Sequence, residues 1–123
     1  MTKPPKACPG SATKVFPLQR RLRYWQKILR LKDWTITVEW SPSLVEDEGQ
    51  NEIVEENRES TIYLDSALKK SHRRADVALV HELLHIPFEF ARDGDGVSVT
   101  DVLLEQGIQQ VALGMVEIEW RTK

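Results

Sequence analysis

Apolar side chains recur at helical spacing in the first third of the chain. They follow one another at steps of four, three and four residues, as Leu18, Leu22, Trp25 and Leu29. This period matches one buried stripe on an amphipathic helix. Pro17 suits the first helical position, because an N–H is not needed there. The pattern predicts a helix from Pro17 to about Lys32.

Two later segments alternate with a period of two, which is typical of half-buried strands. In the first, Trp34, Ile36, Val38 and Trp40 alternate with polar residues until Ser41-Pro42. In the second, from Ser60 to Leu64, the residues Ile62 and Leu64 share a face. Between them, the stretch 46–59 holds seven acidic residues and predicts a loop or exposed hairpin, with a short strand at Ile53-Val54.

The last part of the chain returns to helical spacing. A helix is predicted from about Ser71 to Ile86, and Pro87 is expected to end or kink it. After a loop at Asp93–Gly96, Thr100 or Asp101 is expected to cap a final helix, with apolar positions at Val102, Leu103, Ile108, Ala112 and Val116. The order of elements predicts an α+β fold, with a small antiparallel or mixed three-stranded sheet packed with three helices.

Composition limits the architecture and the chemistry. The chain has 123 residues, 41% of them hydrophobic, which suits one globular domain. Residues 1–16 are rich in proline and poor in large apolar residues, so we expect a flexible tail followed by a single domain at 17–123. The only cysteine, Cys8, excludes an intrachain disulfide and a cysteine-based zinc ribbon.

Charge and hydropathy bear on partners and location. The formal net charge of -2 gives no overall attraction to nucleic acid or to an anionic membrane. No apolar run approaches the ~18 residues that cross a bilayer, and no apolar segment near the N-terminus resembles an export signal. We therefore expect a cytoplasmic protein without a membrane partner.

The strongest chemical signal is an H-E-x-x-H pattern on the second predicted helix. It consists of His81, Glu82 and His85. Residues at i and i+4 lie on one helix face, so both imidazoles can approach one metal ion while the glutamate sits beside it. Catalytic zinc sites use three protein ligands and leave a fourth position for water, so a third ligand is required.

Two glutamates are candidates for that third ligand. On a continuous helix, Glu89 would lie about 12 Å along the axis from His81, too far for metal bonds of about 2 Å. Glu105 lies twenty residues after His85 on the final predicted helix. A loop through Gly94 and Gly96 allows this helix to return beside the first, which makes Glu105 the favoured ligand.

This arrangement resembles the gluzincin metallopeptidases, in particular small single-domain members of the kind found in bacteria and their phages. The resemblance covers about residues 60–115. In that family two histidines and a downstream glutamate hold zinc, and the glutamate of the motif acts as the base. By position, the resemblance implies that His81, His85 and Glu105 bind Zn²⁺ and that Glu82 is catalytic, in a zinc peptidase with a peptide or protein substrate.

Supporting roles are assigned around this motif. The strand at Ser60–Leu64 is a candidate edge for pairing with an extended peptide. On it, Tyr63 is a candidate hydrogen-bond donor to the oxyanion. Asp101 and Gln109 each lie one turn from Glu105 and are candidates to accept the second N–H of a ligand histidine.

Two other functions fit parts of the same sequence. Basic residues on the first helix and near the start of the second predict a possible contact face for nucleic acid. These residues are Arg20, Arg21, Arg23, Lys27, Arg30, Lys69, Lys70, Arg73 and Arg74. A structural zinc site in which Glu82 is incidental is the other alternative, and it would have a closed fourth coordination position.

Overall fold

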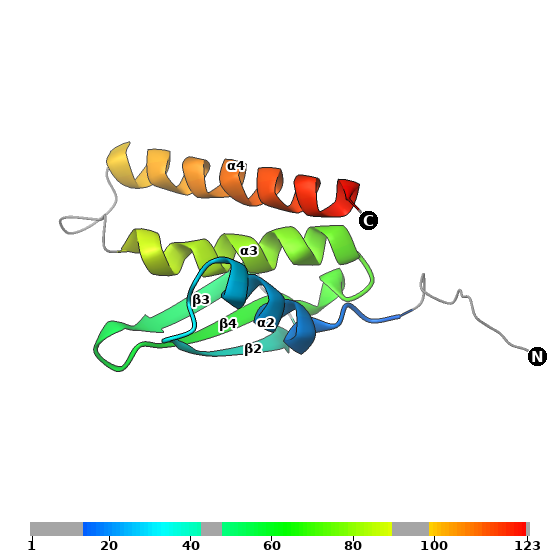
Figure 1. Cartoon of the computed structure of the whole chain (residues 1–123), viewed down its shortest axis with the longest axis horizontal. Helices are drawn as coiled ribbons and strands as arrows, with labels where there is room; N and C mark the ends of the chain where they lie inside the picture. The colour runs from blue at the N-terminus through cyan, green and yellow to red at the C-terminus, as the bar shows by residue number, and fades with distance from the viewer. Residues whose placement is uncertain (1–13, 43–47, 90–98, 123) are drawn as a thin grey trace, which may run out of the picture.

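The computed structural model of the chain describes residues 14–42, 48–89 and 99–122, and of residues 89 and 99–102 it describes the backbone only. A three-stranded sheet, two helices packed on it and one outer helix form the described part (Figure 1). The order is α2 (Leu18–Ile28), β2 (Thr35–Ser41), β3 (Gly49–Val54), β4 (Glu59–Asp65), α3 (His72–Glu89) and α4 (Val99–Arg121). Short 3-10 turns at Glu55–Asn57 and Ser66–Leu68 flank β4. The predicted α+β class is confirmed.

The sheet is mixed, and β4 lies between β2 and β3. β2 pairs with β4 in parallel, with Val38 opposite Ile62. β3 pairs with β4 in antiparallel fashion, with Gly49 opposite Leu64 and Asn51 opposite Ile62. One face of β4 carries buried residues and the other face is only half-buried, so the helices cover a single face of the sheet.

The helices differ from the prediction mainly at their ends. α2 ends at Ile28, and Arg30 then adopts a φ of 59° as the chain turns toward β2. α3 runs through Pro87 to Glu89. A proline in the last turn removes one backbone hydrogen bond there without preventing two further helical residues. α4 begins at Val99, before the residues predicted to cap it.

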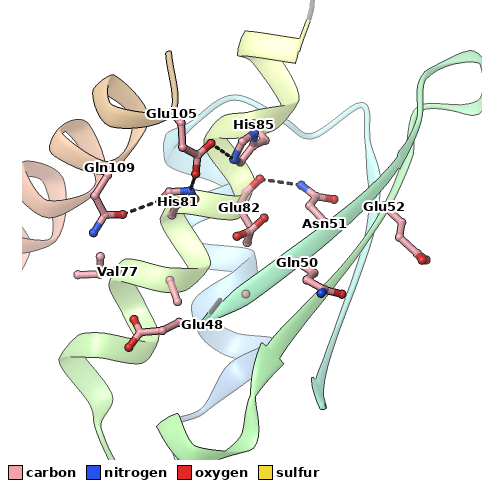
Figure 2. A pocket seen from close by; sticks show the side chains of 12 residues that line it. Glu48, Gln50, Asn51, Glu52, Val77, His81, Glu82, His85, Glu105 and Gln109 are labelled. Carbon is pink, nitrogen blue, oxygen red and sulfur yellow. Dashed lines mark hydrogen bonds and ion pairs between the residues drawn. The ribbon is translucent and has the colours of Figure 1, made fainter. Parts of the chain in front are cut away.

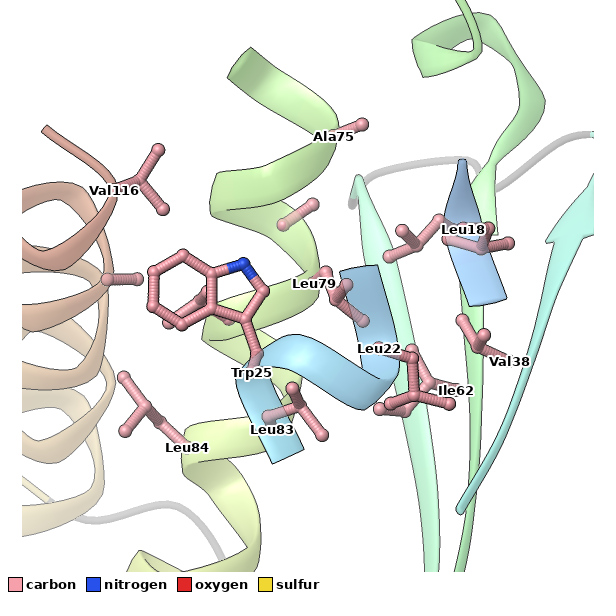
Figure 3. Packing of buried hydrophobic residues seen from close by; sticks show 14 of the residues in the cluster. Leu18, Leu22, Trp25, Val38, Ile62, Ala75, Leu79, Leu83, Leu84 and Val116 are labelled. Carbon is pink, nitrogen blue, oxygen red and sulfur yellow. The ribbon is translucent and has the colours of Figure 1, made fainter. Parts of the chain in front are cut away.

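The core lies between the sheet, α2 and α3, and it extends to the inner face of α4 (Figure 3). Trp25 is only 2% exposed, and Ile62, Leu79 and Leu83 are fully buried. The predicted stripe on α2 is confirmed for Leu18, Leu22 and Trp25. On α4, Ile108, Ala112 and Val116 are buried as predicted, whereas Leu103 is 61% exposed.

The predicted tail does not extend to residue 16. Phe16 is buried, packs its ring edge-on against Trp40 and His72, and donates its backbone N–H to the carbonyl of Lys69. It therefore belongs to the core. Residues 1–13, including Cys8, lie outside the described residues.

A fully buried carboxylate ties the three helices together. Asp76 on α3 accepts hydrogen bonds from the Arg21 guanidinium and the Trp25 indole on α2, and from the Trp120 indole on α4. Burial lowers the pKa of Arg21, but the hydrogen bond and the charge of Asp76 outweigh it and raise this pKa overall. Four N–H donors from these three side chains thus satisfy a charge that would otherwise be costly to bury.

Candidate metal centre

α3 and α4 run side by side in opposite directions, and this places Glu105 against the two histidines of the motif (Figures 1 and 2). Glu105 Oε1 lies 2.6 Å from His81 Nε2, and its Oε2 lies 3.1 Å from His85 Nε2. The two imidazole ring centroids are 5.2 Å apart. One donor atom from each of the three residues lies within 4.8 Å of the others.

The contact that His81 makes through its other ring nitrogen, Nδ1, determines the tautomer of the ring. His81 Nδ1 lies 2.6 Å from Gln109 Oε1, one helical turn after Glu105 on α4. An amide oxygen only accepts, so Nδ1 donates and carries the proton. In the neutral ring, Nε2 then presents its lone pair to the Glu105 carboxylate. Of the two predicted orienting residues, Gln109 makes this contact, and the side chain of Asp101 lies outside the described residues.

Two acceptors that face each other at this distance need a positive charge between them. Either a proton on His81 or a metal ion satisfies this requirement, and His85 Nε2 faces the same carboxylate. Nitrogen and oxygen donors around one zinc ion lie about 3.3 Å apart, given bonds of about 2.0–2.1 Å and tetrahedral angles. The two contacts of Glu105, at 2.6 and 3.1 Å, are shorter than this value, and all three donor atoms lie within 4.8 Å of one another. The donor types and their clustering fit a divalent metal.

Glu82 lies beside this donor set on the buried side of α3. The residue is 7% exposed, and it lines the same cavity as His81, His85 and Glu105. Strand β3 lies against it: a Cβ on Gly49 would come within 3.0 Å of Glu82 Cγ and 3.1 Å of its Oε2. The carboxylate therefore lies between the metal helix and the strand.

Asn51 connects the strand to the metal helix at the level of Glu82. Its amide Nδ2 donates to the backbone carbonyl of Glu82 over 2.7 Å (Figure 2), and its Oδ1 accepts from the buried hydroxyl of Ser60 on β4. This bridge fixes the spacing between β3 and α3. The sequence alone does not reveal the roles of Asn51 and Gly49, since their only local signal is a turn-like Gly-Gln-Asn run.

The cavity is about 510 Å³ and lies between β3, α3 and α4. Its volume is in the range of small-ligand sites. β3, not β4, borders it, because β4 is the central strand of the sheet. The prediction of an edge strand at Ser60–Leu64 is therefore wrong: β3 is the edge strand beside the donor set.

The structure does not bring Tyr63 to this site. Ser60, Ile62 and Leu64 on β4 face the helices, so the alternation of the strand places Tyr63 on the opposite face of the sheet. There the charge of Glu52, together with desolvation and the charge of Glu39, raises the pKa of Tyr63. The predicted oxyanion role of Tyr63 is therefore wrong.

The remaining candidates fall into two groups. His72 Nε2 donates a hydrogen bond to the carbonyl of Lys14, and the ring packs on Phe16, away from the donor set. Several residues of the predicted basic face pair with carboxylates: Arg21 with Asp76, Arg73 with Glu117 and Arg74 with Glu48. The side chain of Glu89 and the loop at Asp93–Gly96 lie outside the described residues.

Comparisons with known proteins find no relative of this chain. No family model matches the sequence, and the searches of curated proteins and of solved structures likewise return no match. Within the described residues, no helix has the length and apolar character needed to span a membrane.

Proposed function

We propose that this protein is a zinc-dependent metallopeptidase. The observation that carries the proposal is the convergence of four side chains at one cavity: His81, His85 and Glu105 as metal donors, with the carboxylate of Glu82 beside them. Three protein donors leave one coordination position for water, which favours a catalytic over a structural site.

The charge of the donor set suits hydrolysis. Two neutral imidazoles and one carboxylate leave a bound divalent ion with a net charge near +1. Zinc bound there would lower the pKa of a water molecule toward about 7 and polarise a substrate carbonyl. Gln109 supports this chemistry, because it keeps the proton of His81 on Nδ1 and leaves Nε2 free to donate its lone pair.

Glu82 is the proposed general base. Its carboxylate takes a proton from water as the water oxygen attacks the carbonyl carbon, and it returns that proton to the leaving amine nitrogen as the C–N bond breaks. Its burial against Gly49 holds the carboxylate in place, since the strand leaves it little room to turn away. The products are a carboxylic acid and an amine.

The edge strand β3 offers a way to hold the substrate. It borders the cavity, and its outer edge is not paired within the described sheet. An extended peptide that adds to such an edge gains main-chain hydrogen bonds without a requirement for sequence. This supports a peptide substrate over a small amide.

The rival function, nucleic-acid binding through a basic face, receives less support. Arg21 is largely buried against Asp76, and Arg73 and Arg74 are paired with glutamates on other elements. The buried pair removes Arg21 from the surface that phosphates can reach, and the glutamates beside Arg73 and Arg74 lower the local positive potential.

The test is a comparison of wild-type protein with Glu82→Gln, with zinc content and cleavage of a casein-derived peptide library both measured. Glu82→Gln should keep its zinc and lose about 10²- to 10⁴-fold in turnover. Glu52→Gln, a glutamate of β3 whose side chain points away from the donor set (Figure 2), is the matched control and should keep its activity within about twofold. Full activity of Glu82→Gln, or no zinc-dependent cleavage by the wild type, would contradict the proposal.

A further inference from the structure

The wall of the cavity is strongly acidic. Three glutamate side chains face it, those of Glu48, Glu82 and Glu105, and no lysine or arginine of the described chain is among the lining residues. Two of these glutamates have roles at the donor set. Glu48 lies at the far end, beside Val77, and away from Glu105 and His85 (Figure 2).

The end of the cavity near Glu48 combines apolar and charged surface. Val77 and Ala78 line it from α3, and Val77 is only half-buried. The carboxylate of Glu48 stands beside them at the start of β3. An aliphatic surface that ends in a carboxylate matches the side chains of lysine and arginine, which combine a methylene stem with a cationic head.

A cation of the chain itself already binds at this place. Arg74, one turn before Val77 on α3, pairs its guanidinium with Glu48 Oε2. Both partners are well exposed, with side-chain exposures of 65% for Arg74 and 48% for Glu48. An exposed pair of this kind is worth at most about 1 kcal/mol, so a cationic ligand can displace Arg74 at little cost.

We propose that Glu48, Val77 and Ala78 form a subsite for a lysine or arginine side chain of the substrate, and that Arg74 occupies it until the substrate binds. The inference rests on the proposed peptidase function, because it names the class of peptide that the site accepts. The backbone of such a peptide would lie along β3, while its basic side chain crosses toward α3.

The contribution of each residue follows from this exchange. Removal of the Glu48 charge takes away the attraction for the basic side chain. Removal of the Arg74 charge takes away the competitor and strengthens binding. Arg73 provides a matched control, because it is the neighbouring arginine and is also exposed, but it pairs with Glu117 on α4.

The test measures binding as well as cleavage. Three fluorescein-labelled octapeptides of alanine and serine carry lysine, norleucine or glutamate at one central position. Norleucine keeps the aliphatic stem and lacks the charge. Dissociation constants are measured by fluorescence anisotropy on zinc-loaded Glu82→Gln protein, in which turnover is suppressed. The same measurement is made after a second change is added to this protein: Glu48→Gln, Arg74→Gln or Arg73→Gln.

The lysine peptide should bind up to about fivefold more tightly than the norleucine peptide, and the glutamate peptide most weakly. Glu48→Gln should abolish the difference between lysine and norleucine. Arg74→Gln should tighten the lysine peptide by about twofold to fivefold, and Arg73→Gln should leave all three unchanged. Equal binding of lysine and norleucine, a preference that survives Glu48→Gln, or no binding of any peptide would overturn the subsite.

A parallel cleavage assay with active protein separates this inference from the proposed function. Selective binding without cleavage would keep the subsite and contradict the peptidase. Cleavage of all three peptides at equal rates, with no difference in binding, would keep the peptidase and overturn the subsite.

Discussion

The backbone of Gly49 lies against the side chain of Glu82, so closely that a methyl group on Gly49 would come within 3.0 Å of Glu82 Cγ. Leu64 Cδ2 would be equally close on the other side. Because Glu82 is buried, neither neighbour has free space into which to move. The glycine therefore lets the edge strand approach the proposed base.

Gly49→Ala should consequently displace Glu82 and lower the free energy of unfolding by about 1–3 kcal/mol, the usual cost of overpacking. Turnover should fall more than zinc affinity, since the three atoms nearest to the new Cβ belong to Glu82 and Leu64 and not to the metal donors. Urea denaturation, zinc titration and peptide cleavage measure the three effects.

Gly107→Ala is the control for this change. A Cβ on Gly107 meets nothing within 4 Å, and alanine is the better helix former, so this variant should gain about 0.5–1 kcal/mol. A fully active and stable Gly49→Ala protein would show that the contact with Glu82 is unimportant.

Asn51 should be required for the position of α3 relative to β3. Asn51→Asp keeps the shape of the side chain but replaces the donor that bonds the Glu82 carbonyl with an acceptor. The loss of this bond should cost about 1–3 kcal/mol of unfolding free energy. Gln50→Glu, the same change at an exposed neighbour, should cost little, and equal stability of the two variants in urea would contradict the role of Asn51.

Asp76 should dominate the stability of the helical layer. Asp76→Asn leaves the Arg21 guanidinium partly buried without its carboxylate, and it replaces one of the two acceptor oxygens with an NH₂ donor that faces an N–H group. Loss of one partner of a buried ion pair typically costs 3–5 kcal/mol. Asp33→Asn is the matched control, because its pair with Arg58 is mostly exposed. Denaturant curves that do not separate these variants would refute the assignment.

Both tyrosines should titrate above the ordinary range of about pH 10. The hydrogen bond to Glu119 raises the pKa of Tyr24, and the charge of Glu52 is the main cause that raises the pKa of Tyr63. A folded-state pKa above the unfolded value stabilises the protein below the unfolded pKa, and this contribution disappears as pH rises through the folded pKa.

Spectrophotometric titration of tyrosinate measures both groups. Tyr24→Phe isolates Tyr63, and the further change Glu52→Gln should move its midpoint down toward the ordinary value. A midpoint of Tyr63 that does not respond to Glu52→Gln would contradict the proposed cause.

The sequence predicted well what depends on local periodicity. The stripe of Leu18, Leu22 and Trp25 and the alternation around Ile62 both mark faces that meet the core, so the helices and two strands followed from them. The central position of β4 did not follow. Strand order depends on pairing partners, and β3 is too polar for its alternation to reveal it.

The candidate site divides in the same way. The spacing of His81 and His85 is a property of one helix, so the sequence alone predicts that both side chains lie on one helix face. Gly49, Asn51 and Asp76 act through partners on other elements, with Asp76 lying 51 residues from Trp25. The prediction for Tyr63 depends on β4 being the edge strand, and the observed strand order, with β4 in the centre, removes that reason.

The central claim is that His81, His85 and Glu105 bind one divalent metal ion together. Isothermal titration of metal-free protein with zinc tests it most directly, with Glu105→Ala beside the wild type and Gln106→Ala, an exposed neighbour on α4, as the control. The wild type and the control should bind one zinc ion per chain, and Glu105→Ala should bind at least about 100-fold more weakly. Zinc affinity unchanged by Glu105→Ala, or no stoichiometric zinc binding by the wild type, would contradict the account.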